Sequence, residues 1–419
     1  MSTPQDNLTE QLGRELHDRG ASVPGNPIGL GDVKRTAGRI RRRRQVAGGV
    51  IVAAAAAVIV PSVMVAGNLL GGDAAPEPAP APSVTQSPKP APSDGPIVLD
   101  ADAPQGADPQ LTYLDGVLLI DSAGNKTELD VEYTNITRAG DEFLATRYGD
   151  PVFSVDVLDA EGRVRDSSPT GTGAVGSADG TVGAWVTPDG KVMTRFQGRT
   201  VQLNTVTGGS PEAVEILGSG SCMEAEGGCR VFVNHQDGSS RPQSVDSHGI
   251  VDVVPGGMQI VRAVSPEGLI AGLVTKPDAD PSAPACSAIY DEQAGKRLFR
   301  TCDFAFGYGA GFSPDGSRIV AQPQDADGLG PRSVVVLDSR TGDTVAEIEV
   351  PDANTARAID SITDTAWEDA GHLLVKTDAD GADGPSYSMF RVDLTDGTVE
   401  RVFEERAAGG EVQPWRFLH

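Results

Sequence analysis

The stretch Phe312–Val320, "FSPDGSRIV", decides the fold. An aromatic residue leads into Ser-Pro-Asp-Gly, and an apolar run follows. Proline at the second turn position, with Asp-Gly after it, favours a tight turn between two antiparallel strands. A single turn of this kind says nothing about architecture, but a repeated one would determine the fold of most of the chain.

The stretch has relatives along the chain. Each relative is a short apolar or aromatic run, a four-residue turn that contains Gly, and a second apolar run. They are "ITRAGDEFL" (136–144), "WVTPDGKVM" (185–193), "AVSPEGLIA" (263–271) and "AWEDAGHLL" (366–374). A strand, a second glycine turn and another strand follow, as in "SVVVLDSRTGDTVAEIEV" (333–350). The unit is therefore four strands, a to d, in which the first turn joins a to b and the second joins c to d.

The spacing of the units predicts a β-propeller. The first turns lie near positions 138, 187, 265, 313 and 368, and the long gap between 187 and 265 fits two shorter units with an extra turn at 223–228. The segment 111–131 adds one more copy in front. Roughly seven such units are typical of a β-propeller. We therefore expect an all-β fold with seven four-stranded blades rather than six or eight, and not a β-sandwich or a β-helix.

The turn at Phe312–Gly316 resembles the aromatic-Ser-Pro-Asp-Gly turn of the TolB-type, WD-like propeller repeat. The resemblance is strongest at 312–320, good at 185–193 and 263–271, and covers most of residues 110–405. With the N-terminal layout described next, it implies a propeller ectodomain on a bacterial single-pass membrane protein. Families with this repeat share no single activity, so the resemblance implies a fold and a location only.

The N-terminal part of the chain predicts a membrane anchor. Residues 46–70 contain no charged side chain, and about 20 apolar residues suffice to span a bilayer. Arg41–Arg44 directly precede this segment, whereas the first basic residue after it is Lys89. The positive-inside rule then places the N-terminus in the cytoplasm. A cleaved signal peptide is the alternative, but it requires a shorter basic region and a shorter apolar core.

This layout divides the chain into four parts. We expect a basic cytoplasmic tail (1–45), a transmembrane helix (46–70), a linker rich in Pro and Ala (71–98) and an extracytoplasmic propeller (99–419). The formal net charge is −25, and 25 basic against 54 acidic residues in 46–419 leave that part at −29. A body this acidic repels phosphate backbones, which argues against nucleic acid as a partner.

The four cysteines all lie in the predicted ectodomain. Cys222 and Cys229 flank the turn at 223–228, and Cys286 and Cys302 flank a strand–turn–strand segment. Each pair thus lies across one hairpin, where cross-strand distances suit a disulfide. Two disulfides are expected outside the cytoplasm. Neither pair has the spacing of a zinc site.

Acidic segments recur between strands b and c of three successive units. Each contains Asp-Ala-Asp: 276–285 (Asp278, Asp280), 323–331 (Asp325, Asp327) and 377–385 (Asp378, Asp380, Asp383). Because b–c connections of a propeller emerge on one face, we expect these carboxylates to gather there. Carboxylates on loops bind Ca²⁺, which makes Asp325, Asp327, Asp378 and Asp380 candidate ligands. Solvated loops, or a docking face for a basic partner, are the alternatives.

No catalytic or cofactor-binding motif stands out. "GSGSC" (218–222) is not a G-x-S-x-G elbow, and "GYGAG" (307–311) lacks the Lys-Ser/Thr ending of a phosphate loop, which favours a glycine cluster at a strand edge. Trp415 is expected in a closing strand that pairs with the first blade. The sequence favours a binding, sensing or scaffold module for a protein or glycan at the cell envelope. A propeller-type hydrolase or lyase with its site in the central channel is the alternative, and a purely structural envelope protein is a third.

Overall fold

The structure is a computed structural model. It describes residues 95–149, 153–224, 228–236, 240–252, 257–274, 285–307, 309, 311–324, 330–351, 359–381, 384–407 and 414–417. The predicted cytoplasmic tail, the predicted transmembrane helix and the linker up to residue 94 lie outside these ranges. In the part of the chain that is described, no helix is long and apolar enough to cross a membrane.

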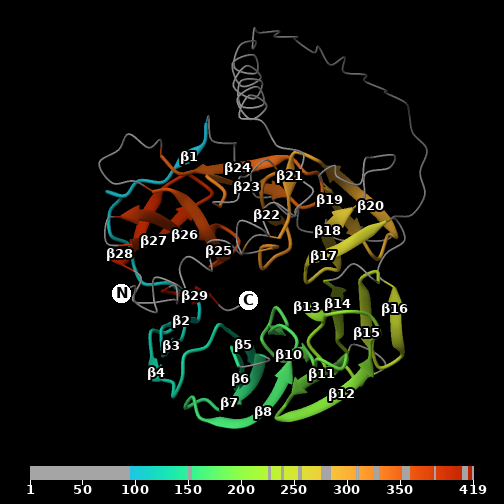
Figure 1. Cartoon of the computed structure of the whole chain (residues 1–419). Coiled ribbons are helices and arrows are strands. Elements are labelled where there is room, and N and C mark those ends of the chain that lie inside the picture. Colours follow the sequence, from blue (N-terminus) through green and yellow to red (C-terminus); the bar gives the residue numbers. More distant parts are fainter. Residues whose placement is uncertain are drawn as a thin grey trace, which may run out of the picture. The chain divides into compact units, whose positions relative to one another are not determined.

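The described strands form seven sheets, arranged as the blades of a propeller (Figure 1). Successive inner strands contact one another, for example β5 with β9 and β9 with β13, which we use to order each blade from strand a to strand d. Blades 1 to 4 contain β29 (Arg416–Phe417), β2 (Tyr113–Asp115), β3 (Leu118–Ile120), β4 (Lys126–Glu128); β5 (Asn135–Ala139), β6 (Glu142–Arg147), β7 (Phe153–Leu158), β8 (Val164–Thr170); β9 (Ala174–Gly176), β10 (Val182–Val186), β11 (Lys191–Phe196), β12 (Arg199–Thr205); and β13 (Pro211–Leu217), β14 (Arg230–His235), β15 (Gln243–Asp246), β16 (Gly249–Asp252).

The remaining blades complete the ring. Blades 5 to 7 contain β17 (Met258–Val264), β18 (Leu269–Val274), β19 (Cys286–Asp291), β20 (Lys296–Thr301); β21 (Phe304–Ala305), β22 (Arg318–Pro323), β23 (Ser333–Asp338), β24 (Thr344–Glu349); and β25 (Ser361–Trp367), β26 (His372–Gly381), β27 (Gly384–Asp393), β28 (Val399–Ala407). The predicted all-β fold with seven blades is confirmed. The a–b and c–d turns form one face, which we call the turn face, and the b–c connections and d–a crossovers form the opposite one, the loop face.

The sequence prediction is wrong for the position of one turn within its four-stranded unit. The segment "TPDG" (187–190) joins β10 to β11, so it is a b–c turn on the loop face rather than an a–b turn. The a–b turn of this blade is Ser177–Gly180, between β9 and β10. Both segments carry a hydroxyl residue two positions before Asp-Gly, so the local pattern cannot distinguish them. The expected extra unit is confirmed, because 218–229 joins β13 to β14 as an a–b connection.

Two chain segments close the ring. β29 pairs antiparallel with β2 through Tyr113 and Phe417, so the expected closing strand next to Trp415 is confirmed. Near the other end of the described chain, β1 (Ile97–Val98) pairs parallel with β24, the outer strand of blade 6. The segment then follows β28 of blade 7, where Gly106 and Arg401 are joined by a backbone hydrogen bond of 2.9 Å. We call residues 97–110 the strap, because they lie along two outer strands before entering β2.

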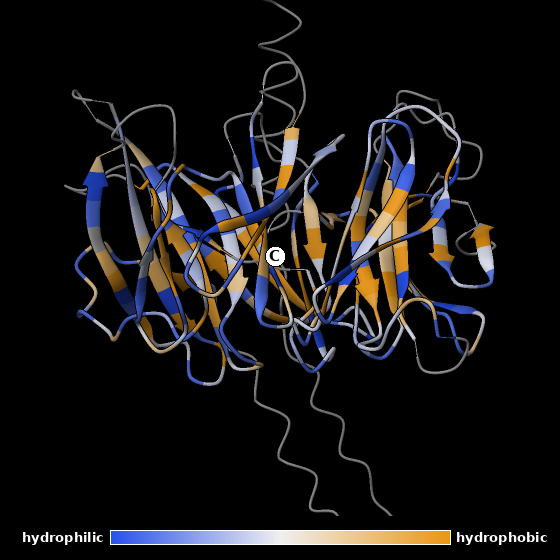
Figure 2. Cartoon of the chain, turned by 90° about the horizontal axis from the view of Figure 1, so that it is seen from below, coloured by the Kyte–Doolittle hydropathy of each residue, from blue (hydrophilic) through white to orange (hydrophobic). Residues whose placement is uncertain are grey.

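The apolar core lies between neighbouring sheets. Strand β26 shows the pattern: Leu373 and Val375 pack with blade 6 and the strap residue Leu99, whereas Leu374 packs with the closing strand on the other side. This alternation follows from the twofold period of a strand whose two faces are both covered. Trp185, on β10 of blade 3, is part of this core and is 1% exposed. Figure 2 shows apolar residues concentrated within the strands and hydrophilic ones at many of the turns.

Candidate functional site

The Ser313–Gly316 turn is held together by its own side chains. The Ser313 hydroxyl donates to Asp315 Oδ1 at 2.6 Å, and the backbone N–H of Ser317 donates to the same oxygen at 3.1 Å. Burial opposes ionisation of Asp315, but these hydrogen bonds outweigh it and lower its pKa. The same hydroxyl–carboxylate bond occurs at Ser177 and Asp179, at 2.7 Å. The Ser-x-Asp-Gly pattern therefore stabilises the turn itself.

The c–d turns use their carboxylates in the same way. Each of several c–d turns begins with an Asp whose Oδ1 accepts backbone N–H groups two to four residues further on: Asp121, Asp159, Asp338 and Asp393. These are Asx-type turns, which satisfy backbone donors that a tight turn leaves without partners. The carboxylates of the turn face are thus largely engaged within their own turns.

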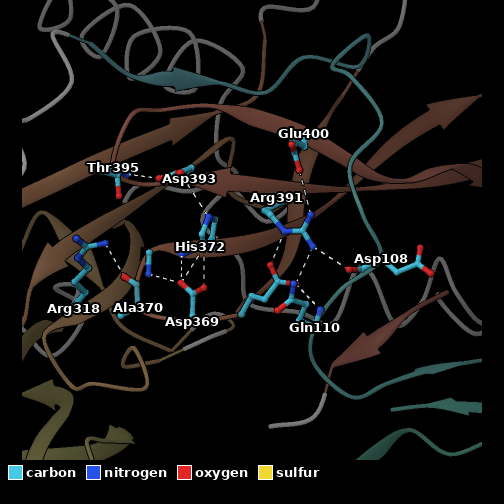
Figure 3. Close-up of polar contacts among 12 residues, drawn as sticks. Asp108, Gln110, Arg318, Asp369, Ala370, His372, Arg391, Asp393, Thr395 and Glu400 are labelled. Carbon is cyan, nitrogen blue, oxygen red and sulfur yellow. Dashed lines mark hydrogen bonds and ion pairs between the residues drawn. The ribbon is translucent and has the colours of Figure 1, made fainter. Parts of the chain in front are cut away.

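A buried polar cluster lies on the turn face of blade 7 (Figure 3). The guanidinium of Arg391 donates from Nε and Nη2 to the two carboxylate oxygens of Glu368, at 2.5 and 2.9 Å. It also donates to the backbone carbonyls of Ala107 and Asp108, both at 3.2 Å. Glu368 in turn accepts the backbone N–H of Gln110 at 2.6 Å. The pair therefore fastens the end of the strap to blade 7, and we read it as a structural latch.

His372 lies beside this latch, between two turns of the same blade. Its Nδ1 is 2.8 Å from Asp369 Oδ2 in the a–b turn, and its Nε2 is 3.6 Å from Asp393 Oδ2 in the c–d turn. The hydrogen bond with Asp369 is the main cause that raises the pKa of His372. All three side chains are partly exposed, so this contact adds little to stability.

The acidic segments occupy the positions that the repeat predicts. They lie between strands b and c of blades 5, 6 and 7, on the loop face. In blade 7, however, the expected long loop is a hairpin: β26 and β27 stay paired as far as Gly381 and Gly384. The Asp/Ala alternation continues the two strands instead of ending them. Asp378 and Asp380 are therefore strand residues.

The four candidate calcium ligands are only partly described. The Asp378 carboxylate accepts a hydrogen bond of 2.6 Å from the Ser361 hydroxyl on the inner strand. Asp380 is described in its backbone alone, and Asp325 and Asp327 lie outside the described residues. Among the side chains that are described, no group of three or more His, Cys, Asp or Glu has metal-site geometry. A calcium site formed by these residues remains a prediction.

Both predicted disulfides are present. Cys222 is bonded to Cys229 across the a–b connection of blade 4, and Cys286 is bonded to Cys302 around the c–d hairpin of blade 5. Their Cα atoms are 4.2 and 4.3 Å apart. No free cysteine remains.

Lys376 is a buried charge that the sequence analysis missed. Its side chain is 1% exposed, and its Nζ donates to the Trp415 carbonyl at 3.2 Å and lies 5.2 Å from the centroid of the Tyr387 ring. Desolvation lowers its pKa from 10.5 to about 8, against an opposing effect of Asp364. Its position two residues after Leu374, on a strand covered on both faces, was the signal that could have revealed it.

Comparisons with known proteins give a structural likeness and no family. No protein-family model matches the chain, and no curated protein matches it. Among solved structures, it is similar to the Cps50 (Swd1) β-propeller domain of Myceliophteria thermophila, with 12% sequence identity and a TM-score of 0.42, over 71% of this chain and 90% of that one. The assignment of a seven-bladed propeller, a fold usually used for binding or scaffolding, rests on the seven sheets themselves.

Proposed function

We propose that this protein is a membrane-anchored extracytoplasmic β-propeller that acts as a binding, sensing or scaffold module at the cell envelope. The observation that carries the location is the pair of disulfides in blades 4 and 5. Structural disulfides persist in oxidising compartments and are rare in the cytosol. Every cysteine of the chain is used in these two bonds.

The sequence before the propeller supports the anchor. Residues 46–70 lack charge and follow Arg41–Arg44, which places the N-terminus inside and the propeller outside under the positive-inside rule. The linker that follows is rich in proline and so behaves as an extended spacer. A binding module at the end of such a spacer can reach partners away from the bilayer.

The topology can be tested with the full chain carrying a different epitope at each end. Protease added to intact cells should cut the linker, release the C-terminal epitope and leave the N-terminal epitope protected. A variant with Arg41–Arg44 changed to Glu is the matched control and should lose this orientation. Protection of both epitopes in intact cells, with cleavage after permeabilisation, would place the propeller inside and refute the proposal.

We place the partner, a protein or a glycan, on the loop face. Many carboxylates of the turn face are engaged within their own turns. The b–c connections of blades 5 and 6 on the loop face are longer and carry Asp-Ala-Asp segments. Long loops on a rigid scaffold commonly carry binding residues. Tyr148, at the loop end of β6, is 70% exposed and packs edge to face on Phe153.

Photo-crosslinking in cells tests the choice of face. A benzophenone amino acid at position 148 on the loop face should give a discrete crosslinked species, whereas the same group at Glu161, in the c–d turn of blade 2, should not. The Glu161 side chain is also well exposed, at 65%, so access to solvent is matched. Crosslinking from position 161 but not from 148 would move the partner to the turn face.

A further inference from the structure

The two disulfides differ in their exposure to solvent. Cys222 and Cys229 are both buried, each 2% exposed. Cys286 is buried as well, at 0%, but its partner Cys302 is exposed. A disulfide is opened when a thiolate reaches one of its two sulfur atoms, so access limits the rate. Of the two bonds, the one in blade 5 has a cysteine that a thiol in solution can approach.

A guanidinium lies beside the buried sulfur of this bond. Arg300 donates from Nη2 to Cys286 Sγ at 3.1 Å. The sheet places it there: Arg300 on β20 pairs with Ala288 on β19, two residues after Cys286, so the side chains of Arg300 and Cys286 lie on the same face of the blade. Among the described side chains, no arginine or lysine donates to the other disulfide. The cation therefore distinguishes the blade 5 bond.

Arg300 is poorly satisfied while the disulfide is intact. The chain carries a net charge of −25, and Arg195, Arg230 and Arg391 are each paired with a glutamate. Within the described part of the chain, by contrast, Arg300 makes no ion pair, and its buried Nε has no hydrogen-bond partner. A disulfide sulfur is only a weak acceptor. A thiolate at the same position would accept a much stronger, charge-assisted hydrogen bond.

This arrangement favours one direction of thiol–disulfide exchange. When an external thiolate attacks Cys302 Sγ, a new bond joins the two attacking and attacked sulfur atoms, the Cys286–Cys302 bond breaks, and its electron pair leaves on Cys286 as a thiolate. A leaving thiol of lower pKa departs faster. Burial alone would raise the pKa of the Cys286 thiol, but a neighbouring arginine lowers it. The guanidinium thus stabilises the leaving group at the buried end of the bond.

We propose that Cys286–Cys302 is a site of thiol–disulfide exchange, opened by a dithiol reductant that attacks Cys302 while Arg300 stabilises the Cys286 thiolate. The second thiol of the reductant then attacks the reductant sulfur bound to Cys302. Cys302 leaves as a thiolate that takes up a proton, and the reductant departs as its own disulfide. The bond lies on the loop face, because Cys286 begins β19 and Cys302 follows β20. This inference goes beyond the proposed function, since it depends on neither the membrane anchor nor the partner.

Reduction of the folded full chain in detergent micelles tests the site. Dithiothreitol is the dithiol, and acid quenching, followed by denaturation, alkylation and mass mapping, records the free thiols at each time. We expect Cys286–Cys302 to open at least about tenfold faster than Cys222–Cys229, because only the former has an exposed cysteine and a stabilised leaving group. With glutathione, a monothiol, the mixed disulfide should form on Cys302 and not on Cys286.

Two variants test the role of Arg300. Arg300→Gln should slow the opening of the blade 5 bond at least about threefold and leave Cys222–Cys229 unchanged. Arg297→Gln is the matched control, because Arg297 lies on the same strand and is exposed; it should react as the wild type does.

A second readout separates an effect on the thiolate from a merely structural one. In Cys302→Ser, Cys286 is the one free thiol, and the ultraviolet absorbance of its thiolate gives its pKa. That pKa should be at least about one unit lower than in the double variant Cys302→Ser, Arg300→Gln. Equal opening rates of the two bonds or glutathione on Cys286, both measured on the wild type, would overturn the proposal. An unchanged opening rate in Arg300→Gln, or equal pKa values of the Cys286 thiol with and without Arg300, would overturn it as well.

Discussion

The most informative single substitution is Lys376→Met. The pKa of Lys376 is lowered from 10.5 to about 8, with desolvation as the main cause. That difference corresponds to about 3 kcal/mol by which the native surroundings disfavour the ammonium form. Replacing a buried charge with an apolar side chain of similar volume is often neutral or stabilising. Methionine loses the hydrogen bond to the Trp415 carbonyl, worth about 1.5–3 kcal/mol when the donor is charged.

We therefore expect Lys376→Met to leave the free energy of unfolding at pH 7 unchanged or to raise it by up to about 1.5 kcal/mol, as the difference between these two effects. The pH dependence gives an independent check. Because the native pKa is below the unfolded value, the unfolded state binds more protons between pH 8 and 10.5. The contribution of Lys376 to stability is thus unfavourable below about pH 8 and becomes less so as the pH rises through this window.

Urea unfolding of the fragment Gln86–His419 at several pH values between 7 and 10.5 measures both effects. The Met variant should lack the rise in stability across the window that the wild type shows. Lys191→Met is the control, because Lys191 is exposed and pairs only with Asp189 in its own turn; its effect should stay within about 0.5 kcal/mol. A Met variant less stable than the wild type by about 2 kcal/mol or more would show that the buried charge is a net stabiliser. An unchanged pH profile would show that the pKa of Lys376 is not lowered in the native state.

Three further predictions follow from the latch, the disulfides and the acidic segments. Arg391→Met leaves Glu368 buried without its cationic partner, so the free energy of unfolding should fall by about 3–5 kcal/mol. Amide hydrogen exchange should accelerate more at Gln110 of the strap than in blade 4, and an unchanged exchange rate at Gln110 would contradict the role of the latch. The purified protein, denatured without reductant, should show no free thiol and should yield only the two intra-hairpin disulfide peptides on mass mapping, and any other pairing would be inconsistent with the blade register. If the acidic segments hold a cation, calorimetry with millimolar Ca²⁺ should give binding heat and a higher melting temperature. Both effects should disappear in a variant with four residues changed to Asn: Asp325, Asp327, Asp378 and Asp380. The absence of binding heat in the wild type would rule the calcium site out.

The repeated hairpin allowed the architecture to be predicted because its determinants are local. A hydroxyl residue, Asp and Gly within four positions specify a tight turn through hydrogen bonds inside that turn, as Ser313 and Asp315 show. The cysteine pairs were equally accessible, since each bridges residues close in sequence around a single connection. Local patterns failed where two connections use the same chemistry. The "TPDG" turn at 187–190 has the hydroxyl-x-Asp-Gly pattern of an a–b turn, although it joins strands b and c.

The burial of Arg391 and of Lys376 depends on contacts between segments that are distant in the sequence. Arg391 is joined to a strap almost 300 residues earlier in the chain, and Lys376 is buried by the closing strand β29, which follows the last two strands of blade 7 and belongs to blade 1. Nothing in the neighbourhood of Arg391 in the sequence indicates burial, and for Lys376 the alternation after Leu374 is the one local signal.

The sequence by itself thus determined the repeat, the all-β class, the disulfide pairs and the acidic character of the propeller, since turns, strand periodicity and short-range cross-links depend on neighbouring residues. Only the tertiary structure decided how the ring closes and which charges are buried. The physical reason is that burial and pairing depend on what packs against a residue. In a propeller those neighbours come from the next blade, and at the seam from opposite ends of the domain.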